Sequence, residues 1–173
     1  RVRITYLRPS LPPIVSWVTV GASRRETIWV DQQEGLEDTD VSAILEVVEG
    51  PPILVERAMY LSNGTRWFDA GHASLGVTRP ATTWYFAEGA TGPFFDEFVL
   101  IANPNAVPLS VGATYLLPSG ATLSKDYVVD GERRFTVWLD HEEFPGLGHA
   151  LADTEVSVLL TSLDGVPLSL IHI

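Results

Sequence analysis

A segment near the start of the chain recurs later in the same chain, and this internal repeat constrains the fold more than any other feature. Residues 3–31 align without a gap on residues 112–140, and 11 of the 29 aligned positions are identical. Six extra residues then enter the second copy, after which "DTDVS" (38–42) meets "DTEVS" (153–157). The sequence therefore predicts a tandem repeat of roughly 110 residues, which is the size of a small β-sandwich domain.

Apolar and polar residues alternate through most of the repeat, which indicates strands and not helices. In "RFTVWLD", Phe135, Val137 and Leu139 fall on one face of an extended segment. Short runs of this kind are separated by turn sequences such as "PSG" and "DG". We expect an all-β fold of immunoglobulin-like antiparallel β-sandwich repeats, one nearly complete and one truncated at its N-terminal side. The predicted core of the second repeat contains Val137, Leu139, Val156, Val158 and Leu160.

The frame of the repeat predicts how the chain is divided. Residues 1–62 form the C-terminal part of one repeat, 63–81 a connecting segment, and 82–167 a second repeat that lacks its last strand. The first copy begins at the equivalent of residue 110, so we expect it to lack two opening strands and to be unable to fold alone. It should borrow strands from 62–105 or leave a sheet edge open. Where the copies overlap, we expect the same two hairpins.

The last six residues do not continue the repeat. After "EGPP" the first copy reads "ILVERAMYL", whereas after "DGVP" the second copy reads "LSLIHI". Those residues back-translate to CTG TCT CTT ATA CAC ATC, which resembles the reverse complement of a common transposase sequencing adapter. We interpret Leu168–Ile173 as a sequencing artefact, and the chain as a fragment of a longer reading frame. The alternative is a diverged last strand.

Composition excludes several classes of function. The net charge is −11, which argues against nucleic acid and anionic lipid as partners, because both require clustered Lys and Arg. There is no cysteine, so disulfides, thiolate metal sites and thiol nucleophiles are absent. No apolar run approaches the ~20 residues of a membrane-spanning helix, so we expect no membrane insertion.

Three phrases of the sequence resemble a known family. "ILVERAMYL", "TTWYFAEGATG" and "FVLIANPN" followed by "VGATYLLPSG" are similar to uncharacterised bacterial domains that occur in tandem in large exported proteins. The resemblance covers most of residues 1–167. It implies an extracellular or cell-surface β-sandwich repeat that neighbours other repeats of the same chain. It brings no catalytic residue and no cofactor.

Tryptophans are the strongest candidates for contact with a ligand or partner. Trp29 and Trp138 occupy equivalent positions in the two copies, on the strand face opposite the predicted core. Together with Trp84 they could contact a surface glycan or a protein partner. They could equally cover the backbone of a neighbouring strand, which is the more common role of scattered surface aromatics.

Other motifs give weaker evidence for metal binding or catalysis. "HEEF" lacks the second His of a zinc-binding helix, and "EGLEDTD" (34–40) clusters carboxylates at a spacing that fits no defined calcium loop, although calcium binding stays open. No catalytic triad signature and no facing carboxylate pair is present. We therefore expect no enzyme, but a structural or adhesive repeat that serves as a spacer or display module. A carbohydrate- or protein-binding module that uses exposed Trp and acidic loops is the alternative.

Overall fold

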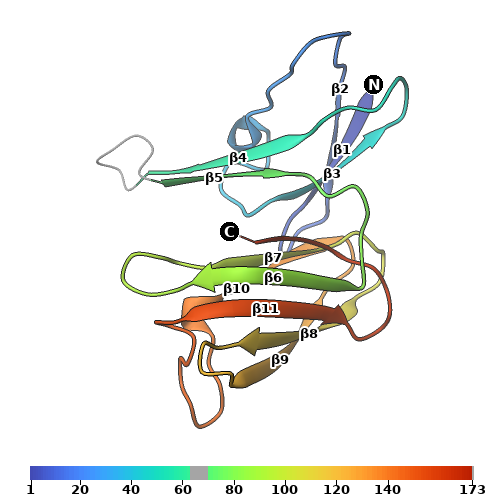
Figure 1. Ribbon diagram of the computed structural model, residues 1–173. Coiled ribbons are helices and arrows are strands. Elements are labelled where there is room, and N and C mark those ends of the chain that lie inside the picture. Colours follow the sequence, from blue (N-terminus) through green and yellow to red (C-terminus); the bar gives the residue numbers. More distant parts are fainter. Residues whose placement is uncertain (63–69, 173) are drawn as a thin grey trace.

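The structure is a computed structural model that describes residues 1–62 and 70–172, and its described part is all-β (Figure 1). The strands before residue 80 are β1 (Val2–Leu7), β2 (Ile14–Val18), β3 (Ser42–Val47), β4 (Glu56–Leu61) and β5 (Ala70–Leu75). The later strands are β6 (Thr83–Ala90), β7 (Phe98–Asn103), β8 (Leu109–Leu116), β9 (Thr122–Val129), β10 (Arg133–Trp138), β11 (Glu155–Ser162) and β12 (Ser169–His172). Two 3-10 helices, η1 (Val30–Gln32) and η2 (Leu139–His141), complete the described part.

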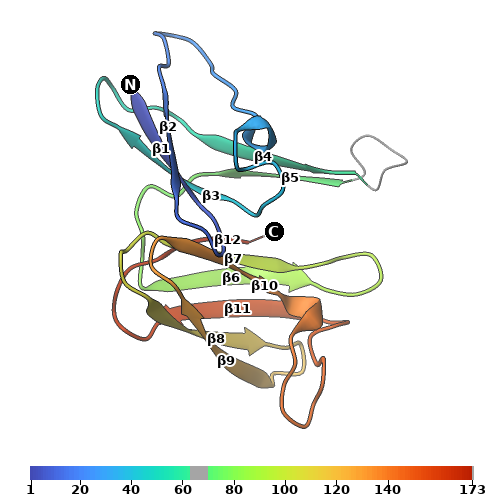
Figure 2. The same cartoon turned by 180° about the vertical axis from the view of Figure 1, so that it is seen from behind.

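Strands β6 to β12 form a two-layer antiparallel sandwich, which we call the second unit. One sheet has the order β10-β7-β12 and the other the order β6-β11-β8-β9 (Figure 2). Inward-facing side chains of both sheets form one apolar cluster. The predicted core residues are confirmed, since the exposed fractions are 1% for Val137, 0% for Leu139, 4% for Val156, 2% for Val158 and 1% for Leu160.

Two residues of β10 differ from the alternation that the sequence predicts. Phe135 was expected inside with Val137, but its side chain is 37% exposed. Since β10 is an edge strand, the inward face at Phe135 lies at the margin of the sandwich, where its ring contacts that of Tyr127 at 5.6 Å between centroids. Arg134 lies on the face of β10 opposite the core, as Trp138 does, and is nevertheless only 3% exposed, because the first part of the chain covers it.

The C-terminal residues complete the sandwich. The sequence predicts a second repeat without its last strand, but residues 169–172 form β12 and pair with β7. Leu168 and Leu170 are buried in the core, with exposed fractions of 0% and 3%. An apolar residue at every second position is enough to fill this place between the sheets. The origin of residues 168–173 as an adapter artefact stays a prediction.

Strands β1 to β5 form the first unit, whose central ladders repeat those of the second. β1 pairs with β2 so that Ile4 faces Ser16, and β8 pairs with β9 so that Ala113 faces Lys125, a shift of 109 for both strands. The ladder of β1 with β3 has the same register as the ladder of β8 with β11. Every residue pair agrees when β1 is shifted by 109 residues and β3 by 115. The helices η1 and η2 also lie 109 residues apart.

The expectation of identical hairpins in 3–31 and 112–140 is nevertheless wrong. The second window contains three strands, and the first contains two, because residues 24–29 are not a strand although they correspond to β10. In the second unit β10 pairs only with β7. No described strand of the first unit takes the place of β7, so residues 24–29 have no ladder to join.

In the first unit, β4 pairs with a strand from the predicted connecting segment and forms a separate two-stranded sheet. β4, within "ILVERAMYL", pairs with β5, whose residues 70–75 lie in the segment 63–81. This agrees with the expectation that strands are borrowed from 62–105. The borrowed hairpin leaves a small core, in which Val2, Ile4, Tyr6 and Leu36 are buried and other apolar side chains are only partly covered.

The difference between the two cores predicts the behaviour of separated fragments. We expect residues 82–173 to show a cooperative thermal transition by circular dichroism, because their core contains both layers of the sandwich. Residues 1–81 should aggregate or show no cooperative transition, because few side chains are fully buried there and net stability is only ~5–15 kcal/mol even for a complete domain. A sharp transition of residues 1–81 would contradict this description of the first unit.

Candidate interaction sites

Trp84, on β6, connects two segments of the sandwich by hydrogen bonds. Its side chain is half-buried against the core of the second unit. The indole Nε1 donates hydrogen bonds to the backbone oxygens of Ala81, at 3.2 Å, and Leu168, at 3.1 Å. Trp84 therefore ties the start of β6 to the residue that precedes β12, and its polar atom is fully used.

Trp138, at the end of β10, is 40% exposed but is enclosed by its own neighbours. The indole Nε1 donates to the Asp96 Oδ1 at 3.2 Å. The ring contacts Phe98 at 5.2 Å and His141 at 3.9 Å between centroids. Two rings of the second unit thus contact this indole, while 40% of its side chain stays exposed. The arrangement supports the view that Trp138 covers its own sheet edge.

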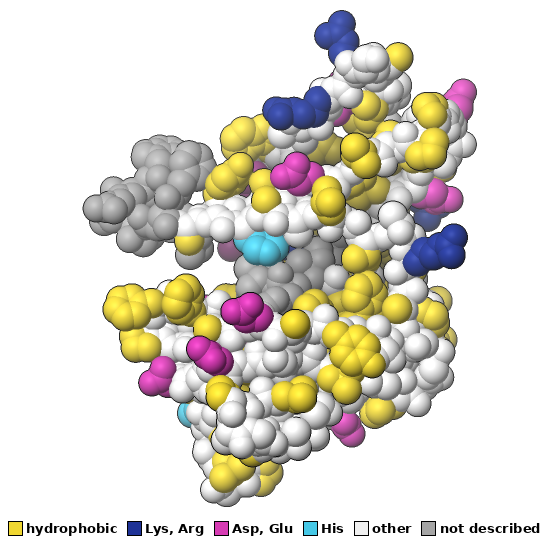
Figure 3. Space-filling view, viewed as in Figure 1, with side chains coloured by type: hydrophobic (Ala, Val, Ile, Leu, Met, Phe, Trp, Pro, Cys, Tyr) yellow, Lys and Arg dark blue, Asp and Glu magenta, His cyan; other side chains and the backbone are white. Residues whose placement is uncertain are grey.

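Trp29 is the most exposed of the three predicted tryptophans, with 62% of its side chain accessible. Its equivalent Trp138 lies on a strand next to β7, whereas Trp29 lies in an extended segment without a ladder. Several other large apolar side chains are exposed on both units, including Phe94 at 91% and Tyr85 at 77%, as the yellow surface in Figure 3 illustrates. Trp29 is thus one of several accessible aromatic groups.

The two units contact each other through a buried arginine, which the sequence did not reveal as a contact. Arg134 Nη2 lies 3.5 Å from the Oδ2 of Asp40, and it donates to the Thr136 Oγ1 at 2.6 Å. Thr136 in turn donates to the same Asp40 oxygen at 3.0 Å. The carboxylate comes from the first unit and both of its partners come from β10 of the second.

A second arginine shares this counter-ion. Burial lowers the pKa of Arg57, on β4, and the nearby Asp40 carboxylate opposes that shift. Burial likewise lowers the pKa of Arg134, Asp40 raises it, and Arg57 lowers it further by repulsion. Asp40 is therefore a negative charge that acts on both guanidinium groups. Its loss would leave Arg134, which is 3% exposed, without the ion pair described for it.

Apolar contact accompanies the ion pair. Leu100 and Ala102 lie on the outer face of β7, opposite the core, yet their exposed fractions are only 5% and 8%. They line a small pocket of about 50 Å³ together with Ser42, Ala43 and Ile44 from the start of β3. The first unit therefore covers part of the outer face of the sheet β10-β7-β12.

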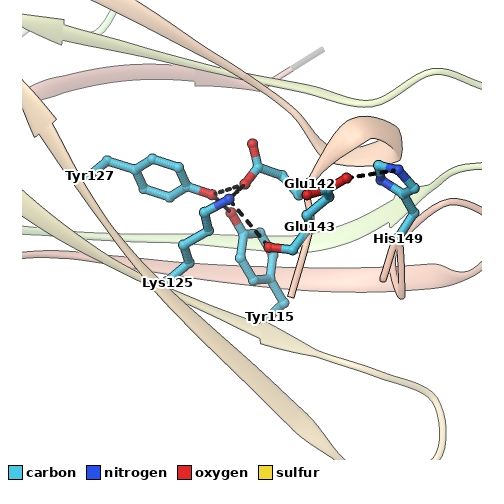
Figure 4. A network of polar contacts seen from close by, with 6 residues as sticks. All are labelled: Tyr115, Lys125, Tyr127, Glu142, Glu143 and His149. Atoms are coloured by element: carbon cyan, nitrogen blue, oxygen red, sulfur yellow. Dashed lines mark hydrogen bonds and ion pairs between the residues drawn. The ribbon is translucent and has the colours of Figure 1, made fainter. Parts of the chain in front are cut away.

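A chain of polar contacts connects β8, β9 and the residue that follows η2 in the second unit (Figure 4). The hydroxyls of Tyr115 and Tyr127 lie 2.7 Å apart, and Tyr127 donates to the Glu142 Oε2 at 2.8 Å. The Lys125 Nζ also donates to this carboxylate oxygen, at 2.5 Å. Burial raises the pKa of both tyrosines above the ordinary value, and the neighbouring tyrosine and Glu142 raise that of Tyr127 further. Both phenols are therefore neutral donors at ordinary pH, and the cluster stabilises the fold.

The first unit has the same buried tyrosine without this network. Tyr6 corresponds to Tyr115 and is equally buried, at 1% exposed. The positions of Tyr127 and Lys125 are occupied by Val18 and Ser16. The Tyr6 hydroxyl has no hydrogen-bond partner among the described residues. The inward alternation of β8 places Tyr115 in the core, and a buried phenol needs a partner, so this network is one that the sequence could have suggested.

No metal site is formed by the described residues. Within 1–62 and 70–172, no three His, Asp or Glu side chains are grouped so that they could hold an ion. In the acidic loop, Asp40 is engaged with Arg134, while Glu34, Glu37 and Asp38 are exposed. An open groove of about 560 Å³ is lined by Glu88, Asp96 and other residues, among them Phe95, Glu97 and Glu155, but it is wide and has no grouped ligands.

Comparison with known proteins adds little to these observations. No protein-family model and no curated protein sequence matches the chain. One solved structure that it resembles is an Anabaena sensory rhodopsin transducer, with 22% sequence identity and a TM-score of 0.48 over 56% of this chain and 91% of that chain. No helix in the described part is long and apolar enough to cross a lipid bilayer.

The two buried tyrosines predict opposite results for the same substitution. Tyr6→Phe should raise the free energy of unfolding slightly, or leave it unchanged, because it removes a buried hydroxyl that has no partner. Tyr115→Phe should lower it by about 1 kcal/mol, because it removes the hydrogen bond with Tyr127. Urea denaturation of both variants measures the difference. Equal losses would contradict the assignment of the network to the second unit alone.

Proposed function

We propose that the chain is a non-catalytic structural or adhesive repeat module, a spacer or display domain of a large exported bacterial protein that lies outside the cell or on its surface. The observation that carries the proposal is the agreement of the ladders. β1, β2 and β3 pair as β8, β9 and β11 do, at constant shifts. Two copies of one architecture in series are typical of proteins that use repeats to set length and spacing.

The contact between the units supports a role in spacing. A spacer must transmit position from one repeat to the next, and flexible linkers do this poorly. Here Arg134 of the second unit is buried against the first and holds Asp40 through an ion pair and through Thr136. Because the Asp40 side chain is 58% exposed, the pair adds little stability, and we expect its main effect to be on the relative orientation of the two units. An ion pair and hydrogen bonds between the units are suited to hold two repeats in one relative orientation. We call this contact the joint between the units.

Substitution of Asp40 tests whether this joint fixes the spacing. Asp40→Asn should widen the distribution of distances between the units, because it removes the negative charge that Arg134 and Arg57 share. The cost should be about 1–2 kcal/mol, less than for a fully buried pair, because the Asp40 side chain is 58% exposed. Small-angle scattering of the full chain measures the maximum dimension, and urea denaturation measures the stability.

The acidic loop supplies a matched control. Asp38→Asn also removes one negative charge, at a position two residues before Asp40. The Asp38 side chain is exposed and makes no ion pair among the described contacts. It should leave the scattering curve and the stability unchanged. If both variants scatter like the unsubstituted chain, the ion pair does not set the spacing and the proposal loses its support from the joint.

A carbohydrate- or protein-binding module is the second candidate, and the exposure of Trp29 favours it. If Trp29 binds a glycan, the full chain should give a signal on a glycan array, and Trp29→Ala should weaken that signal by about tenfold or more. Trp17→Ala is the control, since Trp17 is 49% exposed but has Arg1 4.4 Å above its ring. The spacer proposal expects no signal from the chain or from either variant.

A further inference from the structure

The joint between the units contains two guanidinium groups beside the partly exposed carboxylate of Asp40. Arg57 is half-buried and Arg134 is 3% exposed, whereas the Asp40 side chain is 58% exposed. The two arginines repel each other, and Asp40 attracts both. Arg134 has Asp40 as its ion-pair partner, while Arg57 forms no ion pair with a described residue. The three residues together carry a net positive charge.

Each of these arginines also has a buried nitrogen without a hydrogen-bond partner. The two atoms are the Arg57 Nη1 and the Arg134 Nε, and no described residue accepts a hydrogen bond from them. A third atom of this kind is the Ser74 Oγ. Ser74, on β5, lies directly opposite Arg57 in the ladder of β4 with β5, so the two side chains are neighbours on one face of that hairpin.

These atoms come from both units. Arg57 and Ser74 belong to the first unit, and Arg134 belongs to β10 of the second. The Arg134 Nη2 is occupied, because it donates to the Thr136 Oγ1 at 2.6 Å and lies 3.5 Å from the Asp40 Oδ2. The Nε of the same guanidinium group is therefore a separate donor, and the polar contacts described at the joint leave it unused.

A cluster of buried donors without partners is unusual, because nearly all buried polar groups in folded proteins are hydrogen-bonded. A buried guanidinium group without a partner costs free energy in two ways, since both its charge and its N–H groups lose water. A water molecule would satisfy the N–H groups but would leave the charge uncompensated. An anion would satisfy both. Oxyanions are the preferred partners of guanidinium groups, and a serine hydroxyl can donate to the same ligand.

We propose that Arg57, Ser74 and Arg134 form a binding site for a small free oxyanion, of the class of phosphate and sulfate, at the joint between the units. The oxygens of the anion accept hydrogen bonds from the Arg57 Nη1, the Ser74 Oγ and the Arg134 Nε. The anion enters on the side of Asp40, whose side chain is open to water. This inference goes beyond a spacing role, because it gives the joint a ligand that links one unit to the other.

Calorimetry of the full chain with sodium phosphate, at constant ionic strength, tests the proposal. We expect saturable binding of one anion per chain. Arg57→Met keeps the length of the side chain but removes the guanidinium group, and it should weaken binding by at least about tenfold. Ser74→Ala removes one donor and should weaken binding by about threefold to tenfold. A titration with sodium sulfate should give the same order of affinities for the three proteins.

Arg25→Met is the matched control. It changes the net charge by the same amount as Arg57→Met, at the position of the repeat that corresponds to Arg134, but Arg25 is exposed. This variant should bind phosphate like the unsubstituted chain. Equal losses in Arg57→Met and Arg25→Met would overturn the proposal, because the anion would then respond only to the overall charge. Absence of saturable binding of both phosphate and sulfate would also overturn it.

Stability without phosphate supplies a second, independent measurement. In urea denaturation without oxyanions, Ser74→Ala and Arg57→Met should not lower the denaturation midpoint, because the removed groups have no partner in the chain. With phosphate, the midpoint of the unsubstituted chain should rise more than that of either variant. A lower midpoint of both variants without phosphate would contradict the proposal, since their polar groups would then have partners within the protein. The scattering test of Asp40→Asn concerns the spacing alone, so either proposal can fail without the other.

Discussion

The antiparallel ladder at the centre of each unit, β1 with β3 and β8 with β11, determines the rest of the structure. A strand in this ladder directs half of its backbone groups to each side, and both sides must be satisfied. The second unit does so with β9 beyond β8 and β6 beyond β11. The first unit has the corresponding ladder and the outer strand β2, but no described strand pairs with the other edge of β3. The unequal cores of the two units follow from this difference.

The remaining features of the first unit can be understood as responses to strands that are not beside it. Residues 24–29 form no strand, since the strand that would pair with them has no counterpart in the described part of this unit. β4 takes β5 as its partner, whereas β12, which at the shift of 115 overlaps β4 only at residues 56 and 57, pairs with β7. The outer face of β7 is in turn covered by the start of β3, with Asp40 held by Arg134. The contact between the units thus forms at the start of β3, in the unit that has fewer paired strands.

Much of the fold could be predicted from the sequence because alternation and repetition are local signals. The period of two in β11 placed Val156, Val158 and Leu160 in the core, and the repeat indicated which strands correspond. Properties that depend on neighbours could not be predicted. The burial of Arg134 depends on a segment almost 100 residues earlier, and the partial exposure of Phe135 depends on β10 being an edge strand. The tryptophans suggested ligand or partner sites, yet the indoles of Trp84 and Trp138 donate hydrogen bonds to groups of the second unit.

Amide hydrogen exchange measured by NMR tests the central claim most directly, because it reports each edge of the ladder separately. Leu45 and Leu160 are equivalent residues, and so are Ile44 and Leu159. The account predicts that Ile44, Leu159 and Leu160 are protected, whereas Leu45 exchanges about 100-fold faster or more, because its amide faces an edge without a strand. Protection of Leu45 equal to that of Ile44 would contradict the account, since both edges of β3 would then be paired.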